Sequence, residues 1–342
     1  MNIKRQIATL KAQIEEEKKR RKTGRSGGWL VEKHGAAQLI LIGFTKSGKS
    51  SLLSAVTNAK PIVSDYPFST VEPVVGMFPY QDISFQLVEA PSLQPTVEEV
   101  SWNLKVLGLV RNADGIILVL NLQENPCQQF KLLKRILEDS KIVVEKPKGR
   151  VVIERKNVNL GIQVIGKLLD ATHEEVKQLL NSYRIHSAVV KIYGEATLDD
   201  VEEAVFEGVQ YKPTLIVANK VDTENSEEKL NALKEVVGEK IRILPVSCKT
   251  GKNLDWLGKE IFDLMEILRV YTKHPSKKEP SVEPIILRKG ATVLDVAKEI
   301  HSKLCEKFWY AKVWGPSAKY DGERVGEDHV LADGDVIEIH TR

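Results

Sequence analysis

Short apolar-rich runs alternate with stretches of mixed polarity along most of the chain. The clearest runs end at polar or glycine-containing segments and cover residues 39–42, 83–88, 115–121, 215–218 and 243–246. Runs of this kind are typical of strands buried on both faces, as in a parallel sheet with helices on either side. The pattern predicts an α/β fold whose sheet is formed by residues 36–140 and 213–271.

About ninety residues separate two of these runs, many more than one crossover helix requires. Residues 141–212 are therefore predicted to form an inserted α+β subdomain. The pattern within it indicates strands at 141–144 and 151–153 and a helix that begins near residue 172. A third strand at 188–192 and a second helix that begins near residue 197 follow. A Thr172-x-x-Glu175 capping box marks the start of the first helix.

A C-terminal unit follows a polar, proline-bearing linker at residues 272–283 and covers residues 284–342. Its predicted elements are a strand, a helix with a Thr-x-x-Asp cap, a second strand and a closing strand, at 285–288, 292–304, 308–313 and 333–339. This order predicts a second, smaller α+β domain.

A glycine-containing loop lies between the first apolar run and the helical pattern after it. It reads Gly43-Phe44-Thr45-Lys46-Ser47-Gly48-Lys49-Ser50. The glycines allow successive N–H groups to converge on an anion at a helix N-terminus, Lys49 is suited to neutralising the β- and γ-phosphates, and Ser50 is suited to Mg²⁺. The predicted contacts of a nucleotide phosphate are Gly43, Thr45, Lys46, Ser47, Gly48, Lys49, Ser50 and Ser51.

A loop that follows the run 215–218 indicates which nucleotide base is bound. There, Asp222 can accept two hydrogen bonds, from guanine N1–H and from its amine, whereas adenine offers no such pair. Asn219 and Lys220 are expected to support the loop and to pack on the ring. Taken alone, this loop would be an ordinary turn after a strand.

A third loop, Ser247-Cys248-Lys249, follows the run 243–246 and is suited to donating a backbone N–H to guanine O6. Three such loops, in order after three predicted strands, indicate a guanine nucleotide site.

With these motifs the chain resembles the developmentally regulated GTP-binding proteins of the Obg GTPase superfamily, from about Gly35 to the C-terminus. The resemblance implies a P-loop GTPase that hydrolyses GTP to GDP with Mg²⁺ and acts as a nucleotide switch. Residues 66–76 resemble the family's first switch, in which Thr70 closes over Mg²⁺ when the γ-phosphate is bound. The implied catalytic residues are Lys49, Thr70 and Lys46, and the implied metal residues are Ser50, Thr70 and Glu89.

The other domains add to this resemblance. The insert is similar to a ribosomal-protein module, and the C-terminal unit is similar to a TGS domain, a ubiquitin-like β-grasp module, mainly through residues 314–317 and 324–326. These similarities imply the ribosome or RNA as a partner, and an accessory protein on the C-terminal half, as in some lineages of the family.

One element departs from the family pattern. Where the family has Asp-x-Pro-Gly, this chain has Glu89-Ala90-Pro91-Ser92. The family Asp holds Mg²⁺ through water, so Glu89 requires space for an extra methylene. The family Gly donates its N–H to the γ-phosphate, and Ser92 keeps that N–H but has a narrower range of backbone angles. GTP binding is expected to survive, with a stiffer or slower switch.

Two further positions bear on catalysis. Leu93 stands where many GTPases have a water-orienting glutamine. Some relatives instead use a monovalent cation held by the phosphate loop, and the matching residue here is Lys46. One hypothesis is that the Lys46 ammonium replaces this cation and stabilises charge between the β- and γ-phosphates. The alternative is a solvated loop lysine.

Positive charge is concentrated at the N-terminus. Residues 1–35 carry ten Lys or Arg and four Glu, a net +6, so the remaining residues sum to −3 of the total +3. This N-terminal segment is predicted to be a helical arm that either docks on its own protein or contacts RNA phosphates.

In the C-terminal unit, Tyr310, Lys312 and Trp314 share one strand face. Packing of these side chains is favoured over RNA stacking because residues 283–342 have nine basic and eleven acidic side chains.

Composition limits the protein class. The three cysteines lie far apart without paired spacing, which indicates neither a disulfide framework nor a zinc site. No apolar run approaches the length of a membrane span, and the N-terminus has no signal-peptide core. A cytoplasmic protein with no membrane or DNA partner is expected.

Two other functions remain open. The first is a GTP-binding scaffold with little hydrolysis, favoured by Glu89, Ser92 and Leu93. The second is an RNA-binding protein for which GTP is a structural ligand. Asp222 disfavours an ATPase.

Overall fold

The computed structural model describes residue 29 and residues 31–59, 72–94, 100–155, 161–205, 209–275 and 279–341. Thr70 and most of the first switch expected at 66–76 lie outside the described residues, as does most of the N-terminal arm. None of the described helices is long and apolar enough to cross a lipid bilayer.

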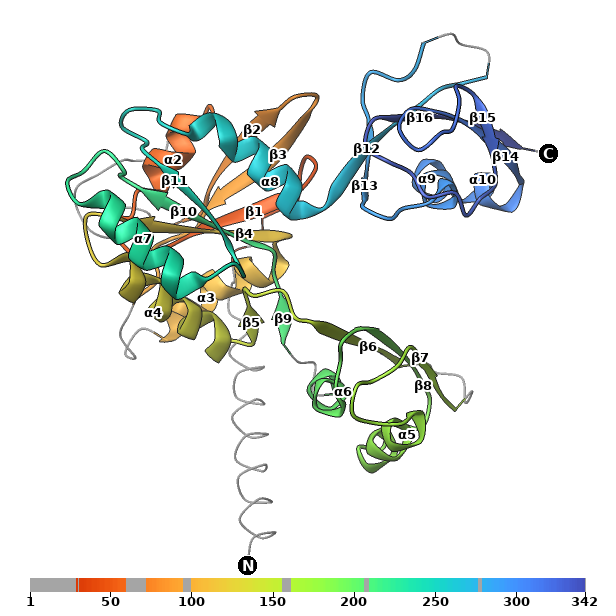
Figure 1. The fold of residues 1–342 in the computed structure, drawn as a ribbon, viewed down its shortest axis with the longest axis horizontal. Helices are drawn as coiled ribbons and strands as arrows, with labels where there is room; N and C mark the ends of the chain where they lie inside the picture. Colours follow the sequence, from red (N-terminus) through yellow and green to blue (C-terminus); the bar gives the residue numbers. More distant parts are fainter. Residues whose placement is uncertain are drawn as a thin grey trace, which may run out of the picture.

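A six-stranded sheet forms the centre of the molecule (Figure 1). Its order is β11-β10-β4-β1-β3-β2, and all neighbours are parallel except the hairpin of β2 and β3. The strands are β1 (Gln38–Ile42), β2 (Val74–Tyr80), β3 (Ile83–Glu89), β4 (Gly115–Asn121), β10 (Thr214–Asn219) and β11 (Arg242–Val246). The predicted P-loop α/β sheet is confirmed.

Helices cover both faces of this sheet (Figure 1). On one face lie α3 (Val100–Asn112), α4 (Pro126–Asp139) and α7 (Ser226–Val237), with one buried core between them and the strands. On the other lie α2 (Lys49–Val56) and α8 (Leu257–Met265), with a second core. Because β1, β4 and β10 are buried on both faces, their sequences are mostly apolar without alternation.

The insert has its own three-stranded sheet and core. Its elements are β6 (Gly149–Arg155), β7 (Ile162–Ile165), α5 (His173–Ser182), β8 (Ala188–Gly194) and α6 (Leu198–Val205), with sheet order β6-β8-β7. The capping box of Thr172 and Glu175 is present. Strand β7 was not predicted, because four residues are too few to give a periodic signal.

The strand predicted at 141–144 does not join the insert sheet. Instead β5 (Ile142–Val143) pairs in parallel with β9 (Gln210–Tyr211). This pairing joins the segment that enters the insert to the segment that leaves it. Ile142 and Val144 are buried in the core beneath the main sheet. Residues 142–144 therefore belong to the main domain, which corrects their predicted place in the insert.

The C-terminal unit is a five-stranded sheet that carries two helices. Its elements are β12 (Ile267–Thr272), β13 (Ile285–Arg288), α9 (Val293–Ile300), α10 (Ser302–Glu306), β14 (Phe308–Trp314), β15 (Glu323–Val325) and β16 (Asp335–Thr341). The helix predicted over 292–304 is two helices, because His301 adopts an extended conformation between them.

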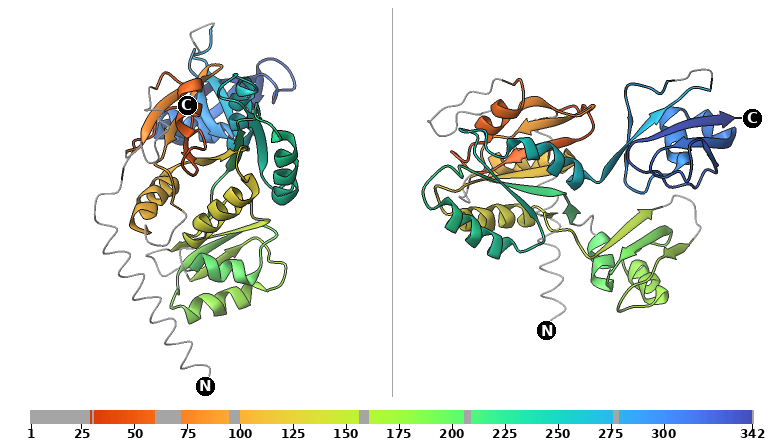
Figure 2. Two further views of the ribbon diagram at one scale, coloured as in Figure 1. Left: turned by 90° about the vertical axis from the view of Figure 1, so that its left-hand side faces the viewer. Right: turned by 45° about the horizontal axis from the view of Figure 1, so that its top comes forward.

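Strand β12 also corrects a predicted boundary. Residues up to 271 were assigned to the main domain, but β12 pairs with β13 and β16, and Leu268 and Val270 lie in the C-terminal core. The C-terminal sheet thus begins directly after α8. In Figure 1 and in the right-hand view of Figure 2, this unit and the insert lie apart from each other beside the main sheet.

An ion-pair network connects the C-terminal unit to the hairpin of β2 and β3. The Arg269 guanidinium contacts Asp82 at 2.6 Å and Asp333 at 2.7 Å. Tyr271 donates to the other Asp82 oxygen. These hydrogen bonds hold the pKa of Asp82 below its usual range. The Arg269 side chain is 15% exposed, whereas its partners Asp82 and Asp333 are 27% and 35% exposed. These charge-assisted bonds connect β12 to the hairpin.

The predicted aromatic face of β14 exists, and its members have partners. Tyr310 stacks on His340 at 4.4 Å and lies 3.8 Å from the Arg324 guanidinium, while Lys273 lies 4.4 Å from the Trp314 ring. These contacts agree with the packing role.

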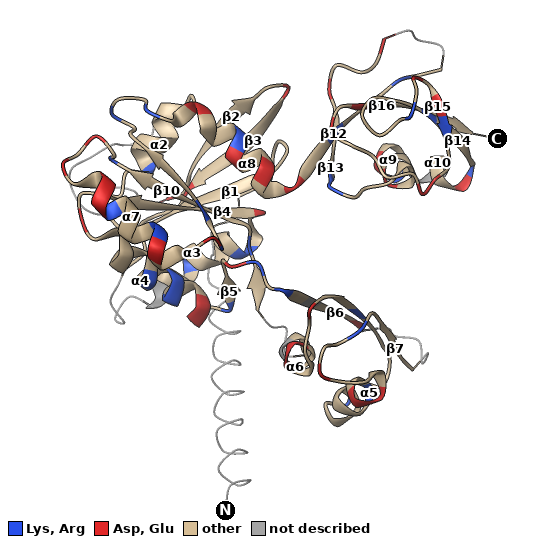
Figure 3. Ribbon diagram, in the orientation of Figure 1, with Lys and Arg blue, Asp and Glu red and all other residues tan. Residues whose placement is uncertain are grey.

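Figure 3 shows acidic and basic residues interspersed along α4, α7 and α8.

Lys212 allows a prediction about pH. The residue is 6% exposed, and its ammonium donates to the Arg111 and Ala113 carbonyls at 2.7 and 2.5 Å. Burial lowers its pKa to about 8, from 10.5 when it is exposed in the unfolded chain. The unfolded chain then binds more protons, so the free energy of unfolding should rise by about 2 kcal/mol between about pH 7.5 and 9.5 from this group.

Urea unfolding at several pH values would measure this contribution as the difference from a Lys212→Met variant, in which the rise should be smaller by this amount. Parallel curves for the two proteins would contradict the assignment.

Candidate functional site

The phosphate loop leaves the carboxyl end of β1 and enters α2. Gly48 has φ +94°, and a Cβ at this position would lie 2.1 Å from Asn219 Nδ2. A Cβ on Gly43 would lie 2.5 Å from the Val119 carbonyl oxygen. Only glycine fits either place. Ser47 Oγ is buried and has no hydrogen-bond partner among the described residues, so it suits a ligand atom.

Lys49 lies at the start of α2 with its side chain buried. Its ammonium donates to the carbonyls of Gly43 and Phe44 at 3.2 and 3.1 Å and to Ser92 Oγ at 2.9 Å. Burial lowers the pKa of Lys49 to about 8, and the nearby Glu89 carboxylate opposes this shift. A cation held among weak acceptors is suited to binding phosphate oxygens, which are stronger acceptors.

The two candidate metal residues on described segments meet at the end of β3. Ser50 Oγ donates to Glu89 Oε1 at 2.5 Å, and the Glu89 side chain is 1% exposed. The extra methylene of Glu89 is therefore accommodated. A hydroxyl and a carboxylate are the hard oxygen ligands that Mg²⁺ takes together with nucleotide phosphates and water. The residues fit the metal.

The base loops are tied to the phosphate loop by Asn219. Its Nδ2 donates to the Ser47 carbonyl at 3.2 Å, and its Oδ1 accepts from the N–H of Lys220 at 2.8 Å and of Cys248 at 3.2 Å. Asn219 is 2% exposed. The three predicted loops therefore meet at one residue. The Cys248 N–H, expected to face guanine O6, bonds to Asn219 in this structure.

Of the remaining base-loop residues, Ser247 is buried, Lys220 is half-buried and Asp222 is exposed. Asp222 Oδ1 accepts from Ser247 Oγ at 2.6 Å, and this bond holds the pKa of Asp222 below its usual range. Lys220 donates to Gln123 Oε1 at 2.8 Å, and burial lowers its pKa. Lys249 is exposed. The Asp222 carboxylate is therefore ionised and oriented at neutral pH.

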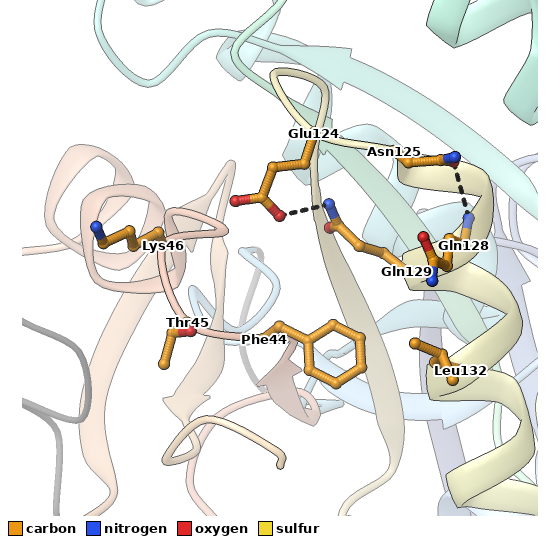
Figure 4. A pocket seen from close by; sticks show the side chains of 8 residues that line it. All are labelled: Phe44, Thr45, Lys46, Glu124, Asn125, Gln128, Gln129 and Leu132. Atoms are coloured by element: carbon orange, nitrogen blue, oxygen red, sulfur yellow. Dashed lines mark hydrogen bonds between the residues drawn. The ribbon is translucent and has the colours of Figure 1, made fainter. Parts of the chain in front are cut away.

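Lys46 and Thr45 lie on the outer side of the phosphate loop, at a pocket of about 290 Å³ beside α4. Figure 4 shows the Phe44 ring pointing toward Leu132 and the Lys46 side chain extending away from α4. Lys46 has φ +60°, and its side chain is exposed. Ser51 follows within α2.

Asn121 is a site residue that sequence reasoning missed. It ends β4, directly beside Asn219 in the strand register, and its Nδ2 donates to the Lys46 carbonyl at 3.4 Å. Two asparagines thus hold consecutive carbonyls of the phosphate loop. A buried polar residue at the end of an apolar strand was the available signal.

The fold and these loops define a P-loop GTPase with a C-terminal TGS domain. Residues 38–156 match the 50S ribosome-binding GTPase family, residues 159–267 match the C-terminal region of that domain, and residues 268–341 match the TGS domain.

Relatives specify the family further. The chain is 36% identical to an uncharacterized GTP-binding protein of Methanocaldococcus jannaschii, over 91% of this chain and 80% of the relative. It is 30% identical to human developmentally-regulated GTP-binding protein 2, over 98% of this chain and 91% of the relative. The chain belongs to the family of developmentally regulated GTP-binding proteins.

Solved structures agree at the level of fold. A GTP-binding protein from Pyrococcus horikoshii OT3 aligns with a TM-score of 0.51 at 16% identity, over 89% of this chain and all of that one. The YchF GTPase of Schizosaccharomyces pombe also aligns at 0.51, with 14% identity over 92% of this chain and all of that one.

Proposed function

We propose that this chain binds GTP with Mg²⁺, hydrolyses it to GDP, and acts as a nucleotide switch linked to the ribosome. The observation that carries the proposal is the junction at Asn219, which joins the phosphate loop to both base loops. A site built this way holds phosphates and a guanine base in one fixed relation.

Each part of the site has a role in hydrolysis. Backbone N–H groups of the phosphate loop and the Lys49 ammonium stabilise charge on the β- and γ-phosphates. Ser50 and Glu89 would hold Mg²⁺, which would supply positive charge to the phosphate oxygens. Asp222 selects guanine. Thr70, outside the described residues, is proposed to close over Mg²⁺ when GTP is bound.

Lys46 is proposed to take the place of a catalytic monovalent cation. Its support is its position in the phosphate loop, whereas its exposed side chain also fits the alternative of a solvated loop lysine. Turnover of a Lys46→Ser variant tests this, since an unchanged rate would exclude the role, and so would a potassium requirement of the wild type.

The link to the ribosome is supported by the description of the matched family, a 50S ribosome-binding GTPase. RNA contact by the basic N-terminal arm and an accessory protein on the C-terminal half belong to the same proposal, as does a cytoplasmic location.

Single-turnover GTP hydrolysis, with sodium or potassium as the only monovalent cation and with or without ribosomes, tests the proposal. We expect slow turnover that ribosomes accelerate. Tight binding without turnover under every condition would favour the GTP-dependent scaffold. Equal ribosome affinity with GDP and with a non-hydrolysable GTP analogue would mean that no switch exists.

Glu89 provides a separate prediction about the metal. A Glu89→Gln variant removes the negative charge but keeps the shape of the side chain. The factor by which Mg²⁺ strengthens GTP binding should therefore be about tenfold smaller than in the wild type, a difference of roughly 1.4 kcal/mol. Calorimetry with and without Mg²⁺ measures the difference. A Glu235→Gln variant, at an exposed position of α7, is a control. An unchanged Mg²⁺ effect in Glu89→Gln would argue against metal binding by Glu89.

A further inference from the structure

Residues 91–94, which follow β3, are bonded to the phosphate loop on one side. The Leu93 N–H donates to the Gly43 carbonyl at 3.3 Å. Lys49 donates to Ser92 Oγ at 2.9 Å. The second bond depends on the serine, because a glycine at position 92 would have no side-chain oxygen.

The same residues are bonded to α3 on their other side. Trp102 Nε1 donates to the Ser92 carbonyl at 3.0 Å. Gln94 and Asn103 exchange two hydrogen bonds, at 3.0 and 2.9 Å. Ser92 therefore stands between the Lys49 ammonium and the Trp102 indole, with a direct bond to each.

Trp102 in turn packs on Trp29, the first residue that the structure describes. The two rings meet edge to face, with centroids 5.7 Å apart and an interplanar angle of 89°. The Lys105 ammonium lies 5.9 Å from the centre of the Trp29 ring. Trp29 also packs against the core beneath the main sheet. Direct contacts thus lead from the phosphate loop to Trp29.

We propose that Ser92 is a positioning residue that couples occupancy of the phosphate site to the packing of Trp102 against Trp29. Nucleotide phosphates draw the Lys49 ammonium away from Ser92 Oγ, and residues 91–94 then shift relative to Trp102. The proposal deepens the proposed function, since it rests on binding of a guanine nucleotide at this site.

The chemistry favours this exchange. Lys49 has three N–H groups, and Gly43, Phe44 and Ser92 each accept one of them. A phosphate oxygen must displace at least one acceptor, and it is a stronger acceptor than a neutral hydroxyl. The two carbonyls belong to the phosphate loop itself, whereas Ser92 lies 43 residues from Lys49. Loss of the Ser92 bond therefore changes the relation between two segments.

Fluorine NMR of the full chain with 5-fluorotryptophan tests the proposal. Five tryptophans give five resonances, which Trp→Phe variants assign. A saturating non-hydrolysable GTP analogue with Mg²⁺ should shift the resonances of Trp29 and Trp102. Those of Trp309 and Trp314, on the C-terminal sheet, should stay in place.

Variants at position 92 separate the hydroxyl from the binding event. In Ser92→Ala, the shifts of Trp29 and Trp102 at saturation should be at least about twofold smaller, because no bond to Lys49 remains to be exchanged. Ser92→Thr keeps the hydroxyl and should restore them. In Trp102→Phe, which lacks the donor to Ser92, the Trp29 resonance should no longer respond.

Calorimetry on the same samples reports nucleotide binding independently. If the wild type binds the analogue without a change at Trp29 and Trp102, the coupling is wrong and the proposed function stands. Full shifts in Ser92→Ala, or shifts in Ser92→Thr no larger than in Ser92→Ala, would overturn it too. If the wild type binds no guanine nucleotide, the proposed function fails and the coupling fails with it.

Discussion

A Lys49→Met variant should bind GTP about 100- to 1,000-fold more weakly than the wild type. Lys49 is the buried cation of the phosphate loop, and its three bonds in this structure lie among weaker acceptors that phosphate oxygens can replace. Two charge-assisted hydrogen bonds to phosphate contribute about 3–4 kcal/mol together, which corresponds to this loss. Calorimetry of the nucleotide-free protein with GTP and Mg²⁺ measures it.

The fold should survive this substitution. Methionine fills most of the space of the lysine stem, and removal of a buried cation whose pKa is lowered to about 8 offsets the lost hydrogen bonds. Lys234→Met, on the exposed face of α7, is the matched control and should bind like the wild type. A Lys49→Met protein with a normal melting temperature and near-normal GTP affinity would exclude the loop as the phosphate site.

An Asp222→Asn variant should exchange guanine for xanthine nucleotides. The substitution removes the carboxylate that accepts from both guanine N1–H and the guanine amine, which should weaken GTP binding by about 100-fold. The new amide N–H can donate to the carbonyl that xanthine has in place of the amine. Because an amide oxygen can still accept from Ser247 Oγ, the loop should keep its shape.

Competition of GTP and xanthosine triphosphate against a labelled nucleotide measures this reversal. Asp199→Asn, in the first turn of α6 in the insert, is the control and should leave the preference for GTP unchanged. Persistent preference for GTP in Asp222→Asn would mean that another residue reads the base.

Strands β1, β4 and β10 of the main sheet were predictable because they are buried on both faces and carry a nearly unbroken apolar signal. Strand β2 was not predicted, because most of its residues are exposed or half-buried. The C-terminal boundary was not. Strand β12 follows α8 directly, and local pattern alone cannot show that it pairs with β16, about sixty residues later. The same holds for β5, whose partner β9 lies beyond the whole insert. Pairings between distant segments decide domain membership, and they leave little trace in a local window.

Some residues of the site could be predicted from the sequence, and others could not. Residue types at fixed spacing predicted Gly43, Gly48 and Lys49, because the backbone of one loop dictates them. The hydrogen bond that Lys49 donates to Ser92 and the bond from Asn121 to the phosphate loop depend on how separate strand ends meet, so the sequence could not specify them. Serine in place of glycine at position 92 was expected to stiffen the switch, and the structure adds a specific contact of its hydroxyl.

Titration of the nucleotide-free wild type with GTP and with ATP, each with Mg²⁺, tests the central claim most directly. The site geometry predicts GTP binding at least about 100-fold tighter than ATP binding, because the Asp222 carboxylate pairs with guanine and not with adenine. Equal affinities for the two nucleotides, or no binding of GTP, would contradict the account of a guanine nucleotide site joined at Asn219.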